Sequence, residues 1–265
     1  MNQDQVKVKL LQLDRDVDHF EVIFSGKTSG KVDGLYKTDS GEIIIHNQNH
    51  KDENSLMYTA IHEFAHHIQF TKSPVPISSR CHTNKFWSIF HNLLFKAEEK
   101  GIFINIFSKD QRFVALTNKI KDKFLVKNGH LMKEFGQLLH EANKLCLENH
   151  VSFDDYVDRE LGLHRTSART IMKISTIDVN PEIGFENMKT VASIRNDDSR
   201  KLAEEAFLEG RSPDMVRAEF TSRKKPEDAL EYLTAEKDRI EKSIDRLAVR
   251  LAQIERKIEN MRYER

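Results

Sequence analysis

The sequence has few cysteines and no long hydrophobic run. Cys81 and Cys146 are its two cysteines, which argues against a disulfide framework and suits a reducing compartment. No apolar run approaches the roughly 18 residues needed to cross a bilayer. The first ten residues also lack the charged-then-apolar order of a signal peptide. We therefore expect a cytoplasmic protein with no membrane partner.

The chain also has no formal net charge at pH 7. The chain has 42 Lys and Arg residues against 42 Asp and Glu residues, so overall charge does not indicate a nucleic-acid partner, and any basic surface must be local. Hydrophobic residues make up 38% and charged residues 32%. That composition is poor in apolar residues for one globule, which indicates that part of the chain is solvated helix.

The most informative stretch that is present is His62-Glu63-Phe64-Ala65-His66, an H-E-x-x-H pattern within a predicted helix from Ser55 to Phe70. Residues i and i+4 share a helix face, so both imidazoles can reach one metal ion. A catalytic Zn²⁺ uses three protein ligands and one water. Glu63 follows the first ligand directly and is the candidate general base.

The third ligand is expected from a second helix. Cys81 and His82 precede an apolar stripe that includes Phe86 and Phe90, and Pro74 and Pro76 mark a loop before them. Two antiparallel helices joined by this loop would bring His82 against His62 and His66. Glu98 or Glu99 is the alternative third ligand.

These residues resemble a known family. HEFAHHIQ followed by His82-x-x-x-Phe86-Trp87 is similar to the SprT-like metalloproteases and the YgjP-type zincins, with ImmA/IrrE-type peptidases as a second relative. A hairpin from Gly34 to His46 would lead into the active-site helix, and the resemblance covers roughly residues 19–100. It implies an α+β zincin domain, Zn²⁺ on His62, His66 and His82, catalysis by Glu63, and a protein substrate.

A second functional signal lies in the middle of the chain. A helix begins after Ser152, turns at Gly162, and a second helix follows from His164 to Lys173. This is the helix-turn-helix layout, and it weakly resembles ParB-type domains over residues 135–222. The layout predicts binding to double-stranded DNA; a plain helical hairpin is the alternative. The outward residues of the second helix would be Arg165, Thr166, Ser167, Arg169, Thr170 and Lys173.

The tail carries an apolar heptad pattern. Between Leu230 and Met261 apolar residues alternate by three and four, with Lys237 at one core position. Such a seam predicts a coiled coil and a homo-oligomer through residues 230–261, and folding back onto its own protein is the alternative. The a positions are Leu230, Lys237, Ile244, Leu251 and Ile258, and the d positions are Leu233, Ile240, Leu247, Ile254 and Met261.

Together these patterns divide the chain into a zincin-like domain (residues 1–107), a connector or packing helix (108–127), an all-α helix-turn-helix domain (128–222) and a coiled coil (226–265). Two functions follow. The first is a zinc endopeptidase that acts on DNA-associated protein, including a mobile-element repressor. The second is a dimeric DNA-binding regulator whose metal site is not catalytic.

Overall fold

The computed structural model describes residues 1–74, 76–77, 81–221 and 229–263. It is mostly helical with a small sheet, in agreement with the expected α+β class. The chain forms two units. The first contains residues 1–71 and 81–221, and the second contains the long helix near the C-terminus.

The strands described form one sheet of order β1-β3-β2. Strand β3 (Glu42–Ile45) pairs in parallel with β1 (Glu21–Phe24) and antiparallel with β2 (Gly34–Lys37). The predicted hairpin is therefore confirmed as β2 and β3. Among the described strands β2 pairs with β3 alone, so β2 is an edge strand of the sheet. Alternate side chains of β3 are buried, as expected for a sheet with one face in the core.

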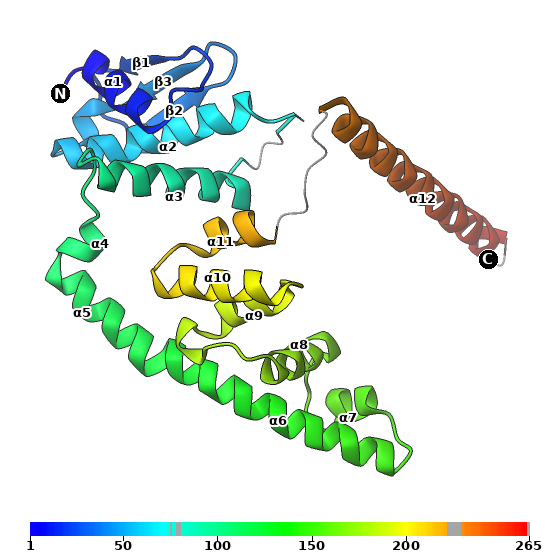
Figure 1. The fold of residues 1–265 in the computed structure, drawn as a ribbon. Helices are drawn as coiled ribbons and strands as arrows, with labels where there is room; N and C mark the ends of the chain where they lie inside the picture. The colour runs from blue at the N-terminus through cyan, green and yellow to red at the C-terminus, as the bar shows by residue number, and fades with distance from the viewer. Residues whose placement is uncertain (75, 78–80, 222–228, 264–265) are drawn as a thin grey trace. The chain divides into compact units, whose positions relative to one another are not determined.

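Helices α2 and α3 position the metal motif. Helix α2 (Glu53–Thr71) packs along β2 and β3, and α3 (Asn84–Glu99) packs against α2 (Figure 1). The predicted apolar stripe of α3 is buried at Phe86, Phe90, Leu93 and Ala97. Helix α1 (Gln3–Leu13) contacts β1 and α2 and completes the core.

The helices that follow α3, from residue 106 to residue 125, carry no core residue. Helices α4 (Ile106–Lys109), α5 (Gln111–Ile120) and the π-helical turn η2 (Lys121–Leu125) bury no side chain. Helix α6 (Val126–Glu148) continues from η2 without a break. Residues 108–127 are thus almost entirely helical, and the expected boundary at residue 127 falls within continuous helix.

The remainder of the first unit is all helical. Gly136 of α6 allows close packing on α8, because a Cβ there would lie 2.5 Å from Ser175 Cβ. Two apolar clusters form the cores of this region. Its other elements are α7 (Phe153–Arg159), α8 (Arg165–Thr176), the 3-10 turn η3 (Pro181–Ile183), α9 (Phe185–Ser193), α10 (Asp197–Leu208) and α11 (Pro213–Phe220). A further 3-10 turn, η1 (Asn47–Asn49), lies between β3 and α2.

Helix α12 (Ala229–Tyr263) is a single helix of 35 residues. All the apolar heptad residues from Leu230 to Met261 are exposed by 40–70%. The predicted start of the coiled-coil region, residues 226–228, lies outside the described residues. In the part of the chain that is described, no helix is long and apolar enough to span a membrane.

Candidate metal centre

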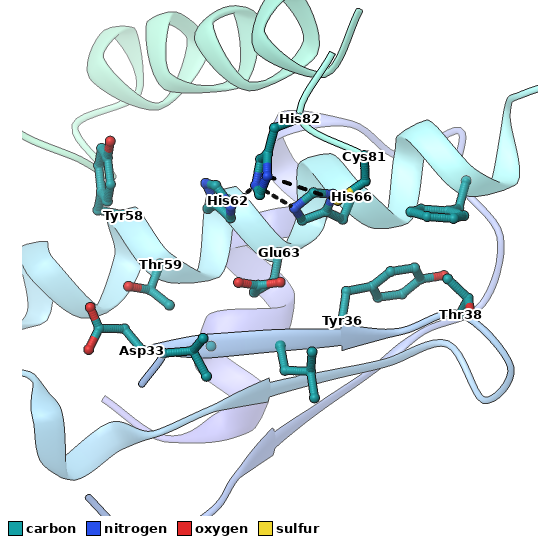
Figure 2. Close-up of a pocket in the computed structure, with 14 residues that line it drawn as sticks. Asp33, Tyr36, Thr38, Tyr58, Thr59, His62, Glu63, His66, Cys81 and His82 are labelled. Carbon is teal, nitrogen blue, oxygen red and sulfur yellow. Dashed lines mark hydrogen bonds between the residues drawn. The ribbon is translucent and has the colours of Figure 1, made fainter. Parts of the chain in front are cut away.

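Three histidine rings converge on one point in the first unit. Helix α2 provides His62 and His66 one turn apart, and the segment just before α3 provides His82 (Figure 2). His82 Nε2 lies 3.1 Å from His62 Nε2 and 3.2 Å from His66 Nε2. We call these residues the three-histidine cluster.

The spacing of these nitrogens suits a tetrahedral metal ion. Two nitrogens that each lie about 2.0–2.1 Å from Zn²⁺ in a tetrahedral site stand roughly 3.3 Å apart. Hydrogen bonds explain the two contacts of His82 Nε2 less well, because this nitrogen carries either one proton or one lone pair. His82 Nε2 therefore cannot bond well to both partners at once. The cluster has the donors and the geometry to bind a metal ion.

Burial keeps two of these rings neutral. Desolvation, with a smaller contribution from the neighbouring histidines, lowers the pKa of both His62 and His66 to about 4. A neutral imidazole keeps the lone pair that a metal requires. Phe86 supports all three rings and is fully buried; its ring stacks on His66 at a centroid distance of 4.2 Å.

Gln69 links the two parts of the cluster. Its amide nitrogen donates to the Cys81 carbonyl at 2.8 Å and contacts Thr83 Oγ1 at 3.2 Å. Among the described residues, neither the Gln69 amide oxygen nor His66 Nδ1 has a hydrogen-bond partner within bonding geometry, and Gln69 acts on the pKa of His66 in the direction opposite to burial. A hydrogen bond from His66 Nδ1 to this oxygen would fix the tautomer in which Nε2 is free to bind metal.

Glu63 lies beside the cluster in the same cavity of about 460 Å³. Its side chain is 7% exposed, and burial raises the pKa of its carboxyl to about 7, opposed by a hydrogen bond from the Tyr36 backbone N–H. Gly34 makes this approach of β2 to α2 possible. A Cβ at Gly34 would lie 2.8 Å from Thr59 Cγ2 and 2.9 Å from Glu63 Cγ.

His67 follows His66 directly but is not part of the three-histidine cluster. It is fully buried. Its Nε2 lies 3.0 Å from the Asp18 carbonyl and its Nδ1 lies 3.1 Å from the Tyr36 hydroxyl. Because a carbonyl only accepts, Nε2 carries the proton and Nδ1 accepts from Tyr36. His67 therefore anchors the strand that borders the metal cavity.

Sequence reasoning missed Gln69, Gly34 and this role of His67. Gln69 stands three residues after His66 on the same helix face, a spacing that could have marked it. No sequence signal marks Gly34, since its importance arises from a contact with a different element. The alternative ligands Glu98 and Glu99 do not join the metal-ligating group that is found among the described residues.

The predicted DNA-binding residues gather on α8. Arg165, Thr166, Ser167, Arg169 and Lys173 are exposed, and Thr170 is half-buried. The helix before them, α7, begins with the expected Ser152 cap. However, Arg165 pairs with Asp158 and Arg169 pairs with Asp154 at 2.6 Å. Acidic residues of α7 thus compensate two of the basic groups on α8.

Comparison with known proteins gives no match: no family model matches the chain, and no curated protein or solved structure is significantly similar to it.

Proposed function

We propose that this protein is a zinc-dependent endopeptidase of the SprT-like or YgjP-like kind. The observation that supports this most is the convergence of His62, His66 and His82 next to the buried carboxylate of Glu63, in one cavity. A structural zinc site is closed by four protein ligands. Three histidines with an acid beside them fit a catalytic site better.

The residues divide the chemistry between them. Zinc held by the three histidines would act as a Lewis acid on the attacking water and on the scissile carbonyl. Glu63 accepts a proton from that water and delivers it to the leaving amine. Burial supports this role, because a carboxyl with a pKa of about 7 can both take and give a proton near neutral pH.

The substrate we propose is a protein associated with DNA. The metal cavity is lined by β2, an edge strand, and its flanking residues from Val32 to Thr38, a length that suits an extended polypeptide. Recruitment to double-stranded DNA would come from α7 and α8, with Arg165, Thr166, Ser167, Arg169, Thr170 and Lys173 toward the duplex. The exposure of five of these six side chains supports that role.

The second candidate is a dimeric DNA-binding regulator in which the metal has no catalytic task. The exposed heptad seam of α12 favours it, since a homo-oligomer through residues 230–261 would pair two helix-turn-helix regions. The burial of Glu63 beside the histidines favours the enzyme, because a structural metal has no use for a general base. Both candidates act in the cytoplasm.

The substitution Glu63→Gln distinguishes the peptidase from the regulator. The amide keeps the size of the side chain but cannot accept a proton, so zinc content should stay at the wild-type level while proteolysis falls by at least about 100-fold. Glu99→Gln, on the exposed face of α3, is the matched control. Cleavage of a protein substrate at a near wild-type rate by Glu63→Gln would end the peptidase proposal.

A further inference from the structure

A second cavity of about 270 Å³ lies between α3, the segment after it, and the turn that joins α10 to α11. Cavities that hold drug-sized ligands measure about 300–1,000 Å³, so this one suits a single long side chain. Five aromatic rings line it, and they come from three parts of the chain: Tyr58, Phe90, Phe95, Phe103 and Phe107.

The charged groups of this cavity are predominantly acidic. Glu98 and Glu209 both line it. Arg211 lines it too, but its guanidinium bonds to the carboxylate of Glu219, which compensates its charge. Burial lowers the pKa of His91, so that this lining ring is neutral near pH 7. Aromatic faces and carboxylates together favour a cation.

This cavity adjoins the metal cavity. Tyr58 lines both of them. Its ring contacts Phe90 and Phe103 at centroid distances of 5.3 and 5.8 Å, and Tyr58 precedes His62 by one helical turn on α2. Figure 2 shows Tyr58 at one end of the row of metal-cavity residues. Because Tyr58 borders both cavities, a polypeptide that extended from the metal cavity past Tyr58 would meet the second cavity.

We propose that the second cavity, here called the cation pocket, binds the side chain of a lysine or arginine in the polypeptide substrate. The aliphatic part of that side chain packs among the aromatic rings, and its charged end lies near Glu98 and Glu209. The pocket then sets substrate preference at a fixed position several residues from the scissile bond. This inference rests on the proposed peptidase function.

Binding can be measured without cleavage. Zinc-loaded full-length Glu63→Gln is titrated with fluorescein-labelled dodecapeptides of Gly, Ser and Ala, in which one lysine occupies each position in turn. A second series carries norleucine instead, which has a similar chain without the charge. At one position, the lysine peptide should bind about five-fold more tightly than the norleucine peptide.

Substitutions of the lining carboxylates test whether the lysine preference arises in the cation pocket. Adding Glu98→Gln or Glu209→Gln should remove most of the lysine preference, whereas Glu99→Gln, also an exposed acid on α3, should keep it. Equal binding of the lysine and norleucine peptides at every position would overturn the proposal, as would a preference that survives Glu98→Gln. Tighter binding of norleucine would assign the pocket to an apolar side chain instead.

Cleavage mapping separates this inference from the function on which it rests. If wild-type protein cleaves a denatured protein mixture, mass spectrometry should find lysine or arginine enriched at one fixed distance from the cut, and Glu98→Gln should lose that enrichment. Cleavage that depends on Glu63 without such enrichment contradicts the cation pocket alone. Lysine-selective binding without any cleavage contradicts the peptidase alone.

Discussion

At the residue scale, His82 is the ligand that most needs a test, because it comes from outside the H-E-x-x-H helix. His82→Ala removes one of three protein ligands, so we expect zinc affinity to fall by at least about 100-fold. His19→Ala is a suitable control, since His19 is 79% exposed. His67→Ala is unsuitable because His67 is buried in the core.

The measurement is zinc affinity by competition with a chromophoric chelator, combined with circular dichroism to show that the variant folds. Equal zinc affinity in the His82→Ala and His19→Ala proteins would exclude His82 as a ligand.

The raised pKa of the Glu63 carboxyl predicts how the free energy of unfolding depends on pH. Its pKa is raised to about 7 by burial, so its contribution to stability is present at low pH and is lost as pH rises through about 7. For metal-free protein, Glu63→Gln should therefore gain stability relative to wild type between pH 5 and pH 8. The gain is at most on the order of 3 kcal/mol.

Urea unfolding of both proteins in the presence of a chelator measures this difference. His62 and His66 titrate in both proteins, so their effect cancels in the comparison. A difference in unfolding free energy that does not change between pH 5 and pH 8 would mean that Glu63 is not desolvated in the folded protein.

At the element scale, the question is whether α8 binds DNA. We expect Arg165→Ala and Arg169→Ala each to weaken binding to duplex DNA several-fold, because each removes a phosphate or base contact. Affinity should also fall as salt rises. The ion pairs to Asp158 and Asp154 are exposed and can exchange for phosphate contacts.

Fluorescence anisotropy with a labelled duplex tests this expectation, and Lys201→Ala, an exposed residue of α10, is the control. Unchanged affinity in both arginine variants, or no binding to any duplex at low salt, would favour a plain helical hairpin.

At the scale of the whole molecule, the exposed seam of α12 predicts self-association, with an antiparallel pair favoured. A parallel pair sets Glu236 against Glu241 and Lys257 against Arg262, which repel, and only Arg250 against Glu255 attracts. The antiparallel register that sets Leu230 opposite Met261 brings Glu236 to Lys257 twice. Exposed pairs contribute little each, so the preference is small. Lys237 then lies near one end, where its ammonium can reach water.

Fluorophores on cysteines introduced at positions 232 and 260 distinguish the two arrangements, with Cys81 and Cys146 replaced by serine. In the antiparallel pair, a label at 232 lies near the partner's label at 260. Efficient transfer between two labels at 232, with little between 232 and 260, would overturn the antiparallel choice. A monomer at micromolar concentration would overturn self-association.

The sequence by itself determined the local elements, because local spacing encodes them. The i, i+4 histidines lie on one helix face, the apolar stripe of α3 is buried, the β2–β3 hairpin forms, and α12 is one continuous helix. The meeting of His82 with His62 and His66 was also foreseen, since a short loop between two helices leaves few arrangements.

Only the tertiary structure decided how distant residues act on one another. The anchoring of Tyr36 by His67, the need for glycine at position 34, and the pairing of α8 arginines with α7 acids depend on which elements approach each other. The cation pocket is the clearest case, because its lining joins Tyr58 and the α3 region to the distant turn at Glu209 and Arg211. The spacing of apolar residues indicates which face of a helix or strand is apolar. Which element packs against that face depends on the packing of the whole chain.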